Sequence, residues 1–454
     1  MRDRLFDALK KSTADYTEIR IETNETVQLA FRGPEMEAAG SSTFTGGIVR
    51  ACIKGGWGSV VFDSLDTLAD QVIEACRCAQ LVGKEKTELA FGPSIDDERP
   101  AKLERDPRGV SLDEKINLIQ SYNRIILEAD PLIETSNVSY TDDFRTVYFA
   151  NSRGSYFKEE RPRVYSAFSA TAREGSLVQR AHESRGSAVT YDAVVGLEDK
   201  VLQMAERAVA LLKAPKVEGG VQTVILNRLL GGVFIHEAFG HLSEADFLYE
   251  NPKLRDLMVI GREMGPRHLN VVDDGSIDRT VGSLTYDDEG TPTSKTYLIK
   301  EGVLAGHLHS METAAKMGAQ PTGNARAVRR GLPPIVRMTN TYIENGETSK
   351  EELFSGVDKG IYALNFFGGQ TEFETFTFSA GHGYRIENGE IGELVRDVVL
   401  TGNLFQTLQH VDGLADDLKL HETGGCGKGG QAPLPVGLGA PHVRIRDVVI
   451  GGEQ

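Results

Sequence analysis

A short segment with two histidines and a glutamate, His236-Glu237-Ala238-Phe239-Gly240-His241, constrains this chain more than any other feature of its sequence. Imidazoles and carboxylates are the groups with which proteins hold a zinc ion and activate a water. Residues five apart on an ideal α-helix point about 140° away from each other, so His236 and His241 would not reach one ion. One extra residue in the turn, a π-bulge, restores the alignment. We therefore predict a helix distorted near Gly240, the residue best able to relax the backbone there.

Two ligands do not make a stable zinc site, because a catalytic zinc ion has three protein ligands and an open position for water. Cys426 lies among glycines that offer it no packing partners, and a thiolate in a flexible loop is a suitable soft ligand. The other candidates for the third ligand are Glu244, Asp246, His307 and His309. A structural interpretation is also open, since a buried histidine more often hydrogen-bonds to the backbone than binds a metal.

The composition is typical of a soluble globular protein and argues against several classes of partner. With 454 residues the chain is too long for one ordinary core, and it is 40% hydrophobic and 26% charged. Its 66 acidic and 50 basic residues give a net charge of -16, which argues against binding to nucleic acid. The sequence has no apolar run of about 20 residues to span a membrane, and its first residues lack the apolar core of a secretion signal. Four cysteines without a disulfide framework favour a cytoplasmic protein.

The hydrophobic pattern predicts an α+β protein with two domains. Residues 1–216 combine amphipathic helices with period-two strands, and we expect an N-terminal α/β domain that a polar connector at 92–109 divides further. Residues 217–454 contain many short apolar segments punctuated by glycine, which favours an antiparallel β-rich, barrel-like domain. We expect this C-terminal domain to carry the metal-site helix.

Taken together, the motifs resemble those of the TldD/TldE family, also called PmbA, of modulators of gyrase. The similarity covers nearly the whole chain, although the first 100 residues match less distinctly. The motifs that carry it are His236-Glu237-Ala238-Phe239-Gly240-His241, Asp287-Asp288-Glu289-Gly290-Thr291-Pro292, His309-Ser310-Met311-Glu312-Thr313-Ala314, Pro321-Thr322-Gly323-Asn324-Ala325-Arg326, Gly368-Gly369-Gln370 and the glycine-framed Cys426.

The resemblance implies a metalloprotease with one zinc ion (Zn2+) per chain, held by His236, His241 and Cys426, and with Glu237 as the catalytic carboxylate. Because the chain retains both histidines and the glutamate, it is similar to the catalytic TldD branch. Family members have an N-terminal α/β domain and a C-terminal β-rich domain, and they act on peptides or unstructured protein segments. They assemble as dimers, so the resemblance implies either a homodimer or a heterodimer with a TldE-like chain.

Physical roles for individual residues follow from their chemistry. Glu237 would act as general base toward a zinc-activated water. A peptide would add to an exposed strand edge near Gly369, and Asp287 would bind its amino terminus or else lie in a solvated turn. His309 would hydrogen-bond the tetrahedral intermediate, or form a second metal pair with His307, or simply pack.

Two other functions stay open at this point. The chain is compatible with a zinc-stabilised binding or assembly protein without hydrolytic activity, in which four protein ligands would close the zinc site. It is also compatible with a metal-dependent amidase that acts on a modified peptide or a small amide. Such an amidase would share the metal chemistry but have a shorter cleft.

Overall fold

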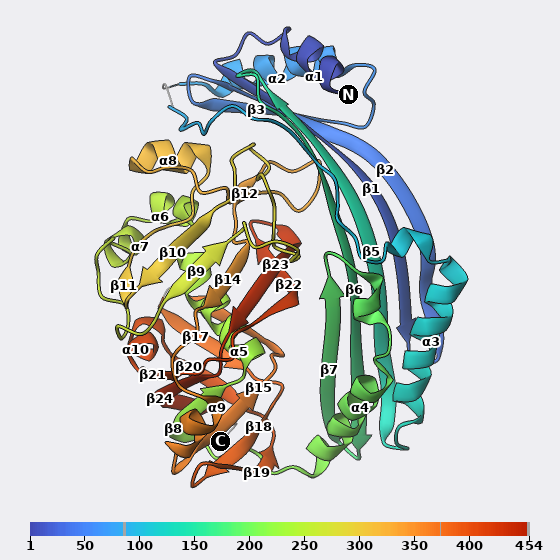
Figure 1. The fold of residues 1–454 in the computed structure, drawn as a ribbon, viewed down its shortest axis with the longest axis vertical. Helices are drawn as coiled ribbons and strands as arrows, with labels where there is room; N and C mark the ends of the chain where they lie inside the picture. The colour runs from blue at the N-terminus through green and yellow to red at the C-terminus, as the bar shows by residue number, and fades with distance from the viewer. Residues whose placement is uncertain (85–87, 373, 452–454) are drawn as a thin grey trace.

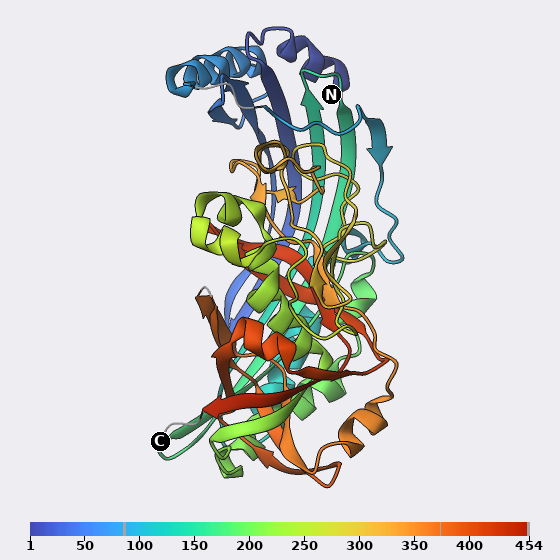
Figure 2. The same ribbon diagram turned by 90° about the vertical axis from the view of Figure 1, so that its left-hand side faces the viewer.

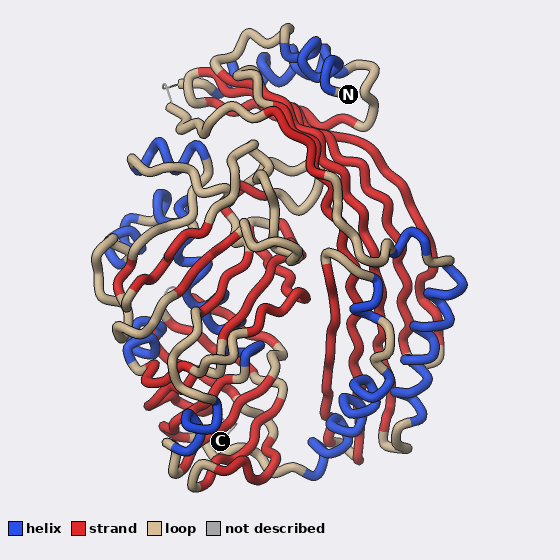
Figure 3. Tube along the Cα trace, viewed as in Figure 1, coloured by secondary structure: helices blue, strands red, loops and turns tan. Residues whose placement is uncertain are grey.

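The computed structural model of this protein describes residues 1–84, 88–372 and 374–451, and its architecture is mixed α/β and sheet-rich. Strands make up most of the regular structure (Figure 3). In the described ranges the strands form sheets of seven, six, two and nine members. Among the helices of these ranges, none combines the length and apolar character needed to traverse a bilayer.

The N-terminal part of the chain forms a long curved sheet (Figure 1). Its strands are β1 (Tyr16–Arg32), β2 (Glu35–Ile53), β3 (Gly56–Phe62), β4 (Asp96–Arg99), β5 (Ile133–Asn151), β6 (Tyr156–Glu174) and β7 (Leu177–Ser187). They run in the order β3-β2-β1-β5-β6-β4, with β7 beside β6. β5 and β6 have 19 residues each, a length of about 60 Å. Burial alternates along much of β5, as the period of two predicted from the sequence requires.

Helices cover the outer face of this sheet in two groups (Figure 1). They are α1 (Arg2–Leu9), α2 (Leu68–Val82), α3 (Leu112–Glu128) and α4 (Glu198–Lys213). The first two pack on one end through Leu5 and Val72, and the other two pack farther along through Ile119 and Val201. The inner face of the sheet is therefore left for the C-terminal part of the chain.

The C-terminal part lies against the inner face of the curved sheet (Figures 1 and 2). One of its sheets contains β8 (Gly220–Leu226), β15 (Lys359–Leu364), β16 (Gly368–Glu372), β17 (Thr375–Ser379), β18 (His382–Glu387), β19 (Glu390–Val395), β20 (Val399–Asn403), β21 (Val411–Leu414) and β24 (Val443–Gly451). Another contains β9 (Val271–Asp274), β10 (Lys295–Lys300), β11 (Val303–Leu304), β14 (Asn340–Ile343), β22 (Lys419–Lys428) and β23 (Gln431–Ala440). A two-stranded sheet pairs β12 (Ala325–Arg326) with β13 (Ile335–Val336).

The nine-stranded sheet is open, so the barrel-like shape expected from the sequence is not found. Its strands follow the order β16-β17-β20-β24-β8-β15-β18-β19, and β21 pairs with β24. A barrel closes only when the first and last strands pair, and β16 and β19 lie at opposite ends of this order. Residues 452–454, the end of the predicted C-terminal domain, lie outside the described residues.

Helix α5 (Arg228–Ile235) contacts strands of both large C-terminal sheets, which share one hydrophobic cluster. Glycines allow this close packing, because a Cβ on Gly232 would lie 2.6 Å from the backbone nitrogen of Gly439 in β23. The remaining helices are α6 (Ala245–Glu250), α7 (Pro252–Leu257), α8 (Met311–Met317), α9 (Lys350–Ser355) and α10 (Leu404–Gln409). The end of α5 is consequently held directly over the β22–β23 hairpin.

Candidate metal centre

The helix that carries the two histidines changes its winding where the sequence predicted a distortion. Asn227 caps α5 by accepting a hydrogen bond from the Leu230 N–H at 2.9 Å. The helix then continues as a π turn over His236–Gly240 and a tighter turn over His241–Ser243. The prediction of a helix distorted near Gly240 is thereby confirmed. The extra residue in the turn brings the rings of His236 and His241 to a centroid separation of 5.2 Å.

Gly240 is required for a different reason from the one inferred from the sequence. Its backbone has ordinary right-handed helical angles, φ -56° and ψ -50°, which any residue adopts. A Cβ at this position would lie 2.1 Å from the Sδ of Met338. The glycine therefore provides space for Met338 and is not needed to relax the backbone.

The backbone around Cys426 also differs from what the sequence predicted. The sequence suggested a flexible loop, but Cys426 lies in β22, opposite Leu434 of β23, and is 1% exposed. Its carbonyl accepts a hydrogen bond from Arg337 at 2.7 Å. The glycines beside it serve the strand pairing, since a Cβ on Gly424 would lie 2.6 Å from the carbonyl oxygen of Val436. The thiol is thus buried and fixed by a paired strand and not by a flexible loop.

The structure brings His236, His241 and Cys426 together. One nitrogen of each imidazole and the thiol sulfur lie within 4.8 Å of one another. The Cys426 Sγ is 3.4 Å from the Nε2 of His241, close to the separation of about 3.6 Å between sulfur and nitrogen ligands of tetrahedral zinc. In addition, the Nδ1 of His236 is buried and has no hydrogen-bond partner in the described part of the chain. Two imidazoles and a thiolate are a donor set that suits zinc.

Three charged residues behind His241 orient its ring. Glu244 is fully buried, and one of its oxygens lies 3.0 Å from the Nδ1 of His241 and 3.0 Å from the Nζ of Lys428. Lys428 also pairs with Asp246 at 2.6 Å. Because Glu244 engages Nδ1, the Nε2 of His241 is free to face Cys426. Carboxylates that hold ligand imidazoles in this way are typical of metal sites.

Sequence reasoning considered Glu244 and Asp246 only as metal ligands and assigned no role to Lys428. Burial opposes the ionisation of Glu244, but the charges of His241 and Lys428 outweigh it and lower the pKa of the carboxyl group. Burial likewise opposes protonation of His241, yet Glu244 and Cys426 raise the pKa of this imidazole well above its usual range. Glu244 lies three residues after His241, but its partner Lys428 is distant in the sequence. Their pairing therefore becomes apparent only from the fold.

A cavity of about 720 Å³ opens beside this group. It lies between β16 and β22, each of which is the terminal strand of its sheet. Glu237 lines it, with one carboxylate oxygen 3.8 Å from the Nε2 of His241 and 31% of its side chain exposed. Gly369, a predicted substrate-binding residue, lines the same cavity. Gly369 also leaves room for the ring of Phe378, because a Cβ on residue 369 would lie 2.2 Å from a ring carbon of Phe378.

The structure does not bring the other two predicted substrate-binding residues to this cavity. Asp287 is fully buried and accepts hydrogen bonds from the N–H groups of Glu289, Thr291 and Ala325, so it does not lie in a solvated turn. His309 contacts Thr313 at the start of α8. His307 and His309 have ring centroids 6.3 Å apart, but the described ranges contain no third ligand that completes a metal group with them.

We predict that Gly240→Ala destabilises the protein by about 1–3 kcal/mol, because the new methyl group collides with Met338. Met338→Ala alone should destabilise it by leaving a cavity. The double variant should then lose less stability than the sum of the two single changes, since the methyl group fills part of that cavity. Urea unfolding of the four proteins measures this coupling, and strictly additive losses would contradict the steric explanation.

We also predict that metal-free Cys426 ionises in mildly acidic solution. Burial opposes ionisation of this thiol, but the neighbouring His236 and His241 outweigh it and lower its pKa to about 5. The thiolate should therefore be present above about pH 5 and disappear below it. Ultraviolet absorbance of the thiolate, taken as the difference between the protein and Cys426→Ser, measures the transition. Cys52→Ser is the matched control, and a midpoint near the usual value of about 8.5 would contradict the prediction.

Three family models match this chain along most of its length. The PmbA/TldA metallopeptidase domain 1 matches residues 17–79, the central domain matches residues 105–214, and the C-terminal domain matches residues 219–452. Among solved structures, a putative modulator of a DNA gyrase from Thermotoga maritima superposes with a TM-score of 0.80 at 21% identity, covering 99% of this chain and 98% of the other. TldE from Thermococcus kodakarensis superposes with a TM-score of 0.78 at 18% identity, covering 100% of both chains. At these identities the two structures support the fold alone.

Curated relatives with higher identity are named metalloproteases. A metalloprotease of Synechocystis sp. is 43% identical over 447 residues, covering 98% of this chain and 96% of that protein. A zinc metalloprotease TldD homolog of Saccharolobus solfataricus is 30% identical over 410 residues, covering 89% of each protein. These names support a metalloprotease-type function for this chain. The family models and the relatives together establish that the chain belongs to the PmbA/TldD family.

Proposed function

We propose that this chain is a zinc-dependent protease of the H-E-x-x-x-H type that binds one zinc ion and cleaves peptides or unstructured protein segments. The observation that carries the proposal is the convergence of His236, His241 and Cys426 on one point beside an open cavity. Their donor atoms and spacing suit zinc, as the metal-site geometry above indicates. Glu237 lies at the same place with part of its carboxylate exposed to the cavity.

We assign the catalytic proton transfers to Glu237. A zinc ion, when bound, acidifies water and polarises the carbonyl of the scissile bond. Glu237 takes a proton from the attacking water and passes it to the leaving amine. Its position next to His241 and on the cavity wall suits this task, because a general base must reach the water without occupying the metal.

The substrate class is inferred from the strand edges that bound the cavity. β16 is the last strand of its sheet order, so one side of it has no neighbouring strand in the described residues. Gly369 and Gln370 in this strand are exposed and line the cavity. An extended peptide that adds to such an edge gains main-chain hydrogen bonds with little demand on its sequence. We therefore propose an unfolded polypeptide as the substrate.

The alternative, a binding or assembly protein stabilised by zinc, is less well supported by the geometry. Structural zinc sites are closed by four protein ligands, whereas the described residues supply a group of three beside a cavity. The cavity is also larger than a small amide requires, which favours a protease over an amidase.

We further propose that the chain divides into two units, residues 1–216 and residues 217–454.

We also propose that two chains assemble. The partner is either a second copy of this chain or a TldE-like chain, and the similarity in fold to TldE is consistent with both. Light scattering of the purified chain should give twice the mass of 49.6 kDa if it forms a homodimer. The mass of one chain would instead indicate that a different partner is needed.

We predict that Glu237→Gln retains zinc but loses cleavage of an unfolded polypeptide by about 100-fold or more, because amide nitrogen and oxygen do not serve as a general base. Glu250→Gln is the matched control, since Glu250 is an exposed carboxylate on the wall of the same cavity. Zinc content and cleavage rate are measured on the same preparations.

Removal of the metal by a chelator should abolish cleavage by the unaltered protein, and added zinc should restore it. Cleavage that survives complete metal removal would refute the metalloprotease proposal. Cleavage retained by Glu237→Gln, with metal dependence intact, would refute only the assignment of the base.

A further inference from the structure

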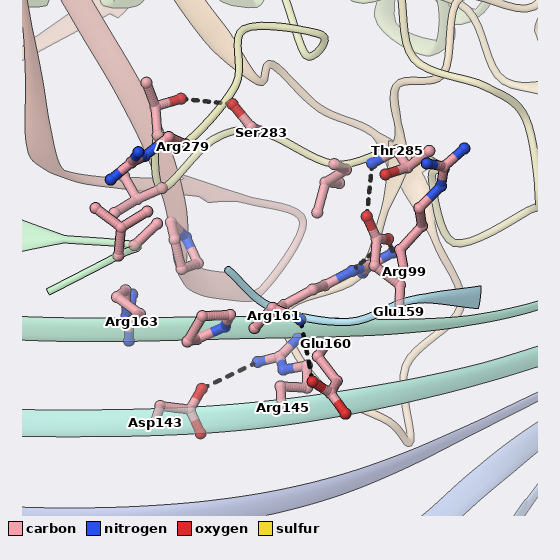
Figure 4. A pocket seen from close by; sticks show the side chains of 18 of the residues that line it. Arg99, Asp143, Arg145, Glu159, Glu160, Arg161, Arg163, Arg279, Ser283 and Thr285 are labelled. Carbon is pink, nitrogen blue, oxygen red and sulfur yellow. Dashed lines mark hydrogen bonds and ion pairs between the residues drawn. The ribbon is translucent and has the colours of Figure 1, made fainter. Parts of the chain in front are cut away.

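A second cavity, of about 270 Å³, lies in the seam between the N-terminal sheet and the C-terminal part (Figure 4). It shares no lining residue with the cavity beside the candidate metal centre. Its walls come from β5 and β6 on one side, from the segments 98–102 and 279–285, and from β23. Cavities at such seams are common ligand sites.

The wall formed by the N-terminal sheet brings three arginines together among three carboxylates. The strand register places Arg145 of β5 opposite Arg161 of β6, and Asp143 opposite Arg163 (Figure 4). Positions two apart on a strand share a face, so all four side chains belong to the face toward the cavity. Like charges directly opposite each other destabilise a sheet unless other groups compensate them.

Four of the five carboxylates that line the cavity are engaged by other groups. Arg161 binds Glu159 at 2.8 Å and Asp288 at 2.8 Å. Glu160 accepts a hydrogen bond from the Ala101 N–H at 3.0 Å. The two remaining carboxylates are Asp143, which accepts a hydrogen bond from Thr26, and Glu98, which is exposed.

Two arginines of the cavity wall lack an acidic partner. Arg326 is 4% exposed and donates to the carbonyl oxygens of Met338 and Pro435, and burial lowers its pKa to about 10. Arg163 is partly buried, and burial lowers its pKa, while the charges of Asp143 and Tyr165 oppose that shift. In the part of the chain that the structure describes, neither guanidinium has a carboxylate oxygen within 4.0 Å. A buried cation without a counter-charge is costly, and an anion in the cavity removes that cost.

We propose that this cavity binds a small oxyanion, a phosphate or a carboxylate group, between Arg163 and Arg326. A guanidinium matches either group with two parallel N–H donors. Pro100, Pro162 and Pro435 in the walls restrict the backbone, so the site is formed before the ligand arrives. The volume admits inorganic phosphate or the end of a short peptide and excludes a folded partner.

The site adjoins the strand hairpin of the candidate metal centre. Leu434 and Pro435 line the oxyanion cavity, and the register pairs them with Cys426 and Gly425 of β22. The two sites are neighbours in the fold but use different residues. Oxyanion binding is therefore independent of the hydrolysis proposed above and is measured separately from it.

Isothermal titration calorimetry of the purified full chain tests the site. The probes are inorganic phosphate, N-acetylalanine and the uncharged N-acetylalaninamide, each at the same ionic strength. At least one of the two anions should bind saturably with one site per chain, and the amide should not bind. Arg163→Gln should weaken this binding by about tenfold or more, because a charge-assisted hydrogen bond is lost. Arg163→Lys should weaken it less, since the charge remains.

Arg173→Gln is the matched control, because Arg173 lies in the same strand but is exposed and pairs with Glu134. Thermal unfolding and zinc content of each variant measure whether the fold is retained. Saturable binding of phosphate alone identifies a phosphate site, and binding of N-acetylalanine alone identifies a carboxylate site such as a peptide terminus. The proposal is overturned if neither anion saturates, if the amide binds as well as N-acetylalanine, or if Arg163→Gln binds as tightly as Arg173→Gln.

Discussion

Two of three consecutive acidic side chains, Asp288 and Glu289, join the two parts of this molecule, while the third, Asp287, bonds within the C-terminal part. All three are buried, and each has partners of its own. Asp288 pairs with Arg161 of the N-terminal sheet at 2.8 Å, and Glu289 pairs with Arg50 at 3.2 Å. Breaking one such buried pair leaves an uncompensated charge, which costs about 3–5 kcal/mol. The arginines of the sheet therefore determine where the C-terminal part docks.

This docking also shapes the wall of the oxyanion cavity. Asp287 accepts hydrogen bonds from backbone N–H groups, including that of Ala325, and Asp288 accepts one from Ala327. These bonds fix the segment that carries Arg326, the buried arginine of the oxyanion cavity. Burial opposes the ionisation of Asp288, but Arg20 and Arg161 outweigh it and lower the pKa of the carboxyl group. Asp288 also favours the protonated form of Arg326, but it forms its ion pairs with Arg20 and Arg161.

The sequence predicted those features that depend on neighbouring residues and missed those that depend on distant ones. The five-residue spacing of His236 and His241 required a distorted helix, and the π turn confirms it. Strand periodicity indicated a sheet-rich protein, but whether a sheet closes depends on which strands pair at its edges. Glycines around Cys426 suggested a loop, whereas the small size of Gly424 serves strand pairing in the β22–β23 hairpin. The run at 287–289 suggested a solvated turn because the arginines that neutralise it lie in another part of the chain.

The elements that form the candidate metal centre pack closely on one another. Helix α5 packs closely on β23, because Gly232 lies against the backbone of Gly439. The hydrogen bond from Arg337 to the carbonyl of Cys426 and the buried chain of His241, Glu244 and Lys428 fix the side chains further. A metal that binds to a site held by such packing uses little of its binding energy to fold the chain. A small zinc domain differs, because it unfolds without its metal. The large hydrophobic cluster around α5 stabilises this arrangement.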